Sequence, residues 1–319
     1  MLKKSLFLLG LTLVLNACSQ PTHDTVANIT DVTVVLDSIT DSTVPLPNEE
    51  LEQTNWDSTK LTYSWLQDFE IENTLVNRIA VPNECQRIEV DRGSYQDWLR
   101  HLPLKSGRSS VLLYNGELKW NQDVHQAVID MDVDPRDLQQ CADAVMRMKA
   151  EYHYQKKEFD QIHFNYTSGD NVPFSKWIQG KKPVVSGRDV VWNSCSSCDG
   201  SYHSFRKYLL KIFNYAGTAS MERELIPKDW KDIKAGDVII KGGSPGHAVM
   251  VLDVAVNQDT GDKLFLISQS YMPAQQSHIL KNPQNSALSP WYSVQEIGSG
   301  NVVTPEWTFD NNSLMEFGY

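Results

Sequence analysis

The alternation of apolar and polar residues predicts an α+β chain with a largely antiparallel sheet. Its clearest strands are residues 238–241 and 247–256, which are mostly apolar and are joined by the glycine-rich segment 242–246. Two turns indicate hairpins: Asn115-Gly116 supplies the positive φ of a type I′ turn, and Ser186-Gly187 separates two short apolar runs. Other strands are predicted at residues 85–90, 125–133, 162–166, 263–268 and 278–280.

Two main helices are predicted from apolar stripes at helical spacing. The first is expected to begin after Asp134, which can cap it, with Pro135 in its first turn. Cys141 falls on its apolar face about two turns later, so this thiol is expected to be buried and unreactive. The second helix is predicted near residues 201–215, and a shorter one is capped by Ser94.

The N-terminal segment has the pattern of an export signal. Residues 1–17 combine a basic start with an apolar run that is too short to span a bilayer permanently. They end in a sequence that resembles a bacterial lipobox, which implies that Cys18 is lipidated, and Ser19 by the same resemblance disfavours inner-membrane retention. We therefore expect an exported lipoprotein at the outer membrane, with residues 18–55 as a flexible tether and one globular domain at 56–319.

The net negative charge of the chain argues against anionic partners. The formal charge of −11 becomes −13 when Lys3 and Lys4 leave with the signal, which argues against nucleic acid or anionic lipid as a partner. Asp130, Asp132 and Asp134 alternate and could collect a divalent cation, but their spacing is not that of an EF-hand loop, and a solvated acidic edge is favoured. No metal site and no cofactor are predicted.

Cysteine spacing leaves several alternatives open. Cys195-Ser-Ser-Cys198 could be a loop disulfide, a redox pair or half of a metal site. His203 would be a third metal ligand, but no convincing fourth lies nearby. A loop disulfide or two free thiols are therefore favoured over zinc.

His247 is the leading candidate for chemistry. It opens an apolar strand directly after the turn Gly242-Gly243-Ser244-Pro245-Gly246, where few side chains hinder the approach of a substrate. A rigidly held imidazole at the rim of a sheet suits a general base. The alternative is a strand-end His that hydrogen-bonds a backbone carbonyl.

Residues 205–270 resemble the second half of papain-like cell-wall hydrolases of the CHAP and NlpC types. The resemblance rests on Ala216-Gly217 at a helix end, on the strand opening Gly236-Asp237-Val238, and on Gly246-His247 at the next strand. It implies a papain-like core in which His247 is the base and Gln269, at the end of the following strand, orients it.

The nucleophile departs from this pattern. The resembling enzymes carry a cysteine in the first turn of the preceding helix, where the helix dipole favours a thiolate. Here that position falls near Ser204 or Phe205, so Ser204 is one candidate, although a first-turn serine is more often a cap. Cys198 is another if the helix begins earlier, although its pairing with Cys195 indicates a loop role. The sequence leaves the nucleophile open.

The chain also resembles, over most of residues 90–295, an uncharacterised family of Bacteroidota surface lipoproteins known as domain of unknown function 4846. That family implies no reaction. The residues that carry the resemblance are 112–118, 137–145, 204–209, 242–249 and 269–275.

Two functions follow as hypotheses. The first is a lipid-anchored papain-like hydrolase or amidase acting on peptide or peptidoglycan amide bonds, and the second is an inactive module that binds a glycan or peptide. A structural lipoprotein in an envelope complex is a third possibility. Trp177, Tyr271 and Trp291 could line a groove for a glycan or peptide, but core or edge packing is favoured for each. The predicted groove comprises Gly242, Gly243, Ser244, Gly246, Ser270, Tyr271 and Trp177.

Overall fold

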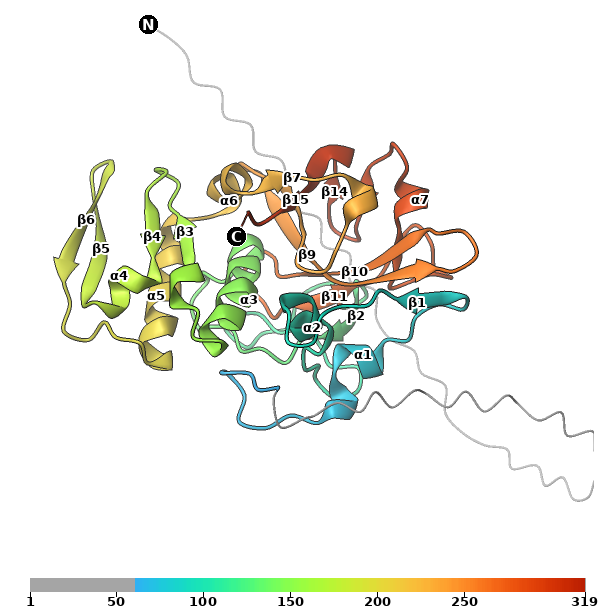
Figure 1. Cartoon of the computed structure of the whole chain (residues 1–319), viewed down its shortest axis with the longest axis horizontal. Coiled ribbons are helices and arrows are strands. Elements are labelled where there is room, and N and C mark those ends of the chain that lie inside the picture. The colour runs from blue at the N-terminus through green and yellow to red at the C-terminus, as the bar shows by residue number, and fades with distance from the viewer. Residues whose placement is uncertain (1–60, 319) are drawn as a thin grey trace, which may run out of the picture. The chain divides into compact units, whose positions relative to one another are not determined.

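The computed structural model describes residues 61–318, so the signal segment, Cys18, the whole tether and the first residues of the predicted domain lie outside the described residues. Its main feature is an antiparallel sheet in the order β2-β11-β10-β9-β8-β15-β7, with β1 on β9 and β12 on β10 (Figure 1). This confirms the predicted α+β class and its largely antiparallel sheet. The strands are β1 (Cys85–Arg87), β2 (His125–Val128), β7 (Ile226–Pro227), β8 (Val238–Lys241), β9 (His247–Asn257), β10 (Lys263–Gln269), β11 (His278–Leu280), β12 (Tyr292–Ser293) and β15 (Leu314–Glu316).

Strand β9 is mostly apolar because both of its faces are covered. Ala248, Met250 and Leu252 belong to the larger apolar cluster, which includes residues of the helices packed on this face. Val249 and Val251 point the other way into a second cluster built largely from C-terminal residues. Since alternate residues of a strand face opposite sides, each cluster takes every second side chain.

The helices form a layer that extends away from the sheet. Helices α2 and α3 pack on β9, and α3 lies between the sheet and α5 (Figure 1). On the far side of α3, α4 and α5 pack with two small hairpins. The helices are α1 (Leu75–Arg78), α2 (Tyr95–Arg100), α3 (Cys141–Gln155), α4 (Phe174–Ile178), α5 (Tyr202–Tyr215), α6 (Thr218–Glu224) and α7 (Val294–Ile297). The two small hairpins are β3 (His163–Asn165) with β4 (Asn171–Pro173) and β5 (Lys181–Ser186) with β6 (Asp189–Ser194). A third hairpin, β13 (Val302–Val303) with β14 (Thr308–Phe309), lies elsewhere, with β14 against β8.

The start of α3 corrects the sequence prediction. The helix begins at Cys141 and not after Asp134, because the Asp143 carboxylate accepts a hydrogen bond of 3.1 Å from the backbone N–H of Gln140 and so caps this end. Asp137 instead accepts a hydrogen bond of 2.6 Å from the Ala274 N–H, which ties its loop to the segment after β10. Cys141 is therefore the first residue of the helix.

The other predicted helices are confirmed. Ser94 caps α2 through its side chain, as expected, and Ser201 does the same for α5, which begins near the predicted residue. The expected hairpin around Asn115-Gly116 is reduced to a single bridge between Leu112 and Leu118. Within residues 61–318 no helix is long and apolar enough to cross a bilayer.

Candidate active site

The turn before His247 is held by α6. The Gly242 N–H donates to Glu222 at 2.8 Å, and the Thr218 hydroxyl donates to the Gly243 carbonyl at 3.2 Å. A Cβ atom on Gly246 would lie 2.4 Å from the Thr218 hydroxyl oxygen. Glycine is thus required here by the close approach of α6.

His247 and Gln269 meet as the sequence hypothesis expects. The ring Nε2 lies 3.0 Å from the Gln269 side-chain oxygen, and both residues are almost wholly buried. Ring centroids of Tyr271, Trp307 and Phe309 lie 4.7, 5.4 and 5.7 Å from that of His247. These aromatic groups cover the imidazole and keep water from competing for its hydrogen bond.

Gln269 is held in turn by a second set of polar groups. Its amide nitrogen lies 2.6 Å from a carboxylate oxygen of Glu306 and 3.3 Å from Nε2 of His278. The other oxygen of Glu306 pairs with Lys119 at 2.5 Å. Lys119, Gln269 and His278 are buried, and the Glu306 side chain is 10% exposed, so these contacts are largely shielded from solvent.

Burial keeps both histidines neutral. It lowers the pKa of His247 to about 4, although the hydrogen bond with Gln269 acts in the opposite direction. It likewise lowers the pKa of His278 to about 3. Neutral imidazole is the form that a general base requires.

Acid is expected to destabilise the fold through His247. Between pH 6.5 and about 4 the unfolded chain binds a proton that the folded site excludes, so the free energy of unfolding falls as pH falls. The contribution is about 2 kcal/mol between pH 7 and pH 5. Urea unfolding at both pH values should show a smaller loss for His247→Gln than for the wild type. His203→Gln, at an exposed position on α5, should match the wild type, and equal pH slopes for all three proteins would contradict the prediction.

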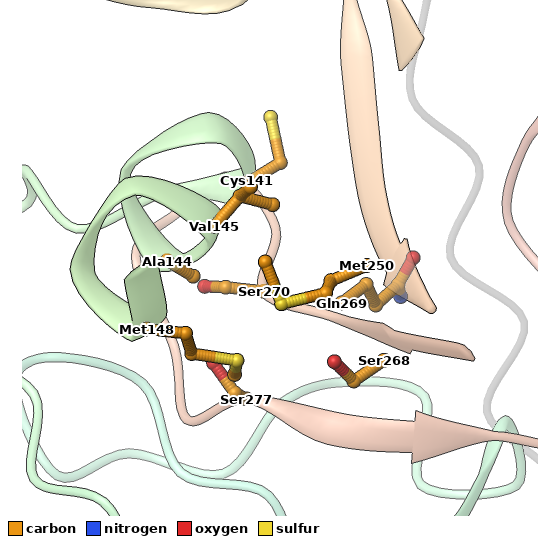
Figure 2. A pocket seen from close by; sticks show the side chains of 9 residues that line it. All are labelled: Cys141, Ala144, Val145, Met148, Met250, Ser268, Gln269, Ser270 and Ser277. Carbon is orange, nitrogen blue, oxygen red and sulfur yellow. The ribbon is translucent and has the colours of Figure 1, made fainter. Parts of the chain in front are cut away.

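Cys141 lies half-buried at the N-terminal end of α3. Cys141 and Gln269 are among the residues that line one small pocket, and Figure 2 shows the thiol at the helix end, pointing away from the other labelled side chains. Burial and then the Asp143 carboxylate raise the pKa of the thiol to about 11, while hydrogen bonds from the backbone N–H groups of Ala142, Ala248 and Cys141 act in the opposite direction. The resting group is therefore a neutral thiol surrounded by N–H donors.

The thiol and the imidazole are neighbours without being bonded to each other. Ala248, whose N–H reaches the sulfur, directly follows His247 in β9. Burial, Glu306 and Cys141 raise the pKa of Tyr271, in that order, and the Tyr271 ring also contacts His247. Among the hydrogen bonds of the described chain, the His247 ring makes its bond to Gln269 and none joins it to Cys141.

Ser204 and Cys198 lie together in the part of the molecule around α5. The Ser204 hydroxyl accepts hydrogen bonds from Trp177 at 2.8 Å and from the Asp199 N–H at 3.0 Å, and it donates to the Ser197 carbonyl. Cys198 forms a disulfide with Cys195, so its sulfur is not a thiol in this structure. Neither residue is hydrogen-bonded to His247 among the described contacts, and both have structural partners.

The predicted groove residues are divided between two regions. Tyr271 is half-buried against His247, and Ser244 is exposed in the turn. Ser270 is fully buried and donates to the carbonyls of Gln139 and Gln275. Trp177 is buried against Tyr208 of α5, with a ring separation of 5.8 Å, and so contributes to core packing.

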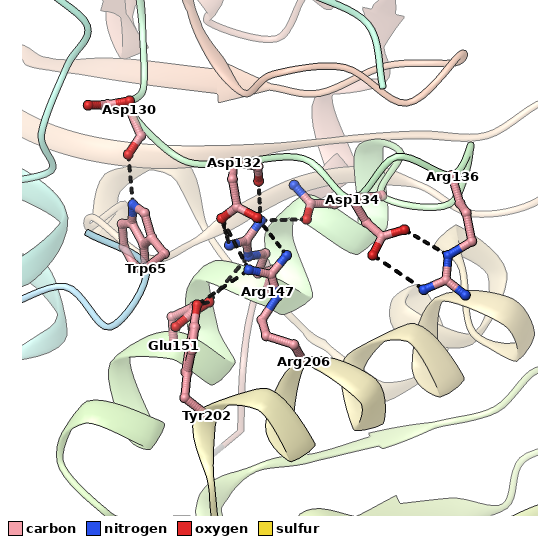
Figure 3. A network of polar contacts seen from close by, with 10 residues as sticks. Trp65, Asp130, Asp132, Asp134, Arg136, Arg147, Glu151, Tyr202 and Arg206 are labelled. Atoms are coloured by element: carbon pink, nitrogen blue, oxygen red, sulfur yellow. Dashed lines mark hydrogen bonds and ion pairs between the residues drawn. The ribbon is translucent and has the colours of Figure 1, made fainter. Parts of the chain in front are cut away.

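The acidic run predicted as a solvated edge is bound by arginines. Asp132 pairs with Arg147 at 2.6 Å and with Arg206 at 2.9 Å, and Asp134 pairs with Arg136 at 2.7 Å (Figure 3). Among the side chains of residues 61–318, no three His, Cys, Asp or Glu groups gather as metal ligands do.

Sequence reasoning missed Lys119, His278, Glu306 and Trp307. Glu306 contacts Gln269 across 37 residues, and no local pattern marks such a pair. A weak signal was present for Cys141: Asp143, at the third helical position, is an acidic residue of the kind favoured in the first turn of a helix.

The model of one protein family, described as a domain of unknown function (4846), matches residues 75–316. No curated protein and no solved structure is significantly similar to the chain.

Proposed function

The chain belongs to the family of domain of unknown function 4846, and for it we propose a thiol-dependent hydrolase that cleaves amide bonds of peptides or peptidoglycan. One observation carries the proposal: the Cys141 thiol, at a helix N-terminus, is contacted by the backbone N–H of Ala248, the residue that follows His247, while Gln269 holds the His247 ring. Nucleophile, base and orienting group are the three roles that such an enzyme needs.

The reaction would proceed through a covalent intermediate. Sγ of Cys141 attacks the amide carbonyl carbon while Nδ1 of His247 takes the thiol proton, so a buildup of free thiolate is not required. Backbone N–H groups at the start of α3 donate to the oxyanion that forms. His247 returns the proton to the departing amine, and it then activates the water that releases the acyl group.

The proposed enzyme is papain-like in the order of its parts. A helix that starts with the thiol packs on the strand that starts with His247, and the next strand ends with Gln269. The lipobox pattern at residues 1–18 supports a location outside the inner membrane, at the outer membrane. Peptidoglycan and its peptides are the amides available there.

The test is turnover by the purified mature protein. Muropeptides and a panel of chromogenic peptide amides should be cleaved by the wild type, and His247→Ala should reduce the rate at least about a hundredfold. His203→Ala, on the surface of α5, serves as the matched control. Equal inertness of folded wild type and His247→Ala would refute the hydrolase, and retention on peptidoglycan in that case would assign the binding module.

A further inference from the structure

The hydrogen-bond network behind Gln269 has only one consistent arrangement. A carboxylate only accepts hydrogen bonds, so the Gln269 group 2.6 Å from Glu306 must be its NH2. The side-chain oxygen of Gln269 then faces His247, and because this oxygen also only accepts, Nε2 of His247 must carry the proton.

His278 uses the remaining hydrogen of the same amide. Its Nδ1 lies 2.9 Å from the Gln276 carbonyl and must donate to it, which leaves the Nε2 lone pair to accept from Gln269 at 3.3 Å. Both hydrogens and the oxygen of the Gln269 amide are thus used. If the Gln269 amide were rotated by 180°, its oxygen would face the Glu306 carboxylate. Two buried hydrogen-bond acceptors would then lie against each other with no hydrogen between them, which is unfavourable.

We propose that Glu306, fixed by Lys119, is a positioning residue that selects the tautomer of His247 with a free Nδ1 lone pair. The role rests on the proposed function, because Nδ1 is the nitrogen that would take the thiol proton from Cys141. The ion pair acts through Gln269 and touches neither the thiol nor a substrate.

The loop that carries Glu306 also covers the imidazole. Glu306 and Trp307 lie between β13 and β14, and the turn is closed by hydrogen bonds between Thr304 and Trp307. Phe309 of β14 packs on the His247 ring at an interplanar angle of 18°. One hairpin therefore supplies both the anion that orients the amide and the aromatic groups that exclude water.

The test reads the tautomer directly by 15N NMR of histidine-labelled mature protein at pH 7. Wild-type His247 should be protonated on Nε2 and unprotonated on Nδ1. In Glu306→Gln the new amide can either accept from or donate to Gln269, so the Gln269 amide is free to turn. When its NH2 group faces Nε2 of His247, that nitrogen must accept, and a population of His247 protonated on Nδ1 should appear. The double variant Lys119→Met/Glu306→Gln also removes the lysine charge that Glu306→Gln leaves buried without its partner. It gives the same measurement if the single variant folds poorly.

Asp310→Asn is the matched control, because Asp310 pairs with Lys241 at 3.3 Å in the same C-terminal segment, away from Gln269. In the amide assay Glu306→Gln should lower kcat by about tenfold or more with KM little changed. Wild-type protonation on Nδ1, or a single Nε2-protonated form in both variants, would overturn the proposal. A tautomer shift without wild-type turnover would instead refute the hydrolase and leave the positioning role of Glu306 intact.

Discussion

Replacement of Cys141 by serine is expected to abolish amide hydrolysis, with kcat/KM lower by about a thousandfold or more. A serine hydroxyl is both a weaker nucleophile and far less acidic than a thiol, so the same base activates it much less. The wild type should also form a covalent acyl adduct, visible by mass spectrometry with slow substrates, that Cys141→Ser lacks.

Cys85 provides the matched control for that substitution. It is a free, half-buried thiol in β1, contacted by Asn257 and distant in the sheet from the start of β9. Cys85→Ser should therefore keep the wild-type rate. Full activity in Cys141→Ser, or equal losses in both variants, would show that the nucleophile is not Cys141.

Arg147→Met is expected to cost about 3–5 kcal/mol of unfolding free energy, because it strips the partner from buried acceptors. The Arg147 guanidinium is fully buried and bonds Asp132 at 2.6 Å, Gln139 at 2.7 Å and Glu151 at 3.3 Å (Figure 3). It also donates to the backbone carbonyl of Asp132. Urea denaturation at pH 7 measures the loss.

Arg136 is the control in the same region. Its side chain is 54% exposed and it pairs with Asp134 near the surface, where such pairs contribute little (Figure 3). Arg136→Gln should change the unfolding free energy by no more than about 0.5 kcal/mol. If the two substitutions cost the same, the buried network around Arg147 is not a main source of stability.

The fold was largely accessible from the sequence where local pattern and burial agree. Strands β8 and β11 begin and end where the apolar runs predict, and β9 extends one residue past the expected end. The start of α3 was missed because Asp134-Pro135 resembles a helix start, while the bond from Ala274 to Asp137 holds that loop outside the helix. A tertiary contact overrode a local signal.

In the candidate site, too, local sequence pattern located some residues, and only the folded structure located the others. His247 begins β9 and Gln269 ends the antiparallel strand β10, so the predicted strand bounds were enough to place the two side chains at the same edge of the sheet. Cys141 was misplaced by the error in the helix start, which made a first-turn thiol look like a core residue. Glu306 and Lys119 are 187 residues apart, and their pairing depends on the folded sheet alone.

The β13–β14 hairpin that covers His247 is also needed to complete the candidate site. Cys141 is synthesised well before Trp307 and Phe309, which lie close to the end of the sequence and contact the His247 ring. A nascent or partly threaded chain would expose the imidazole to water and lack the anion behind Gln269. The proposed active site is therefore complete only after β13 and β14, near the C-terminal end of the domain, have folded.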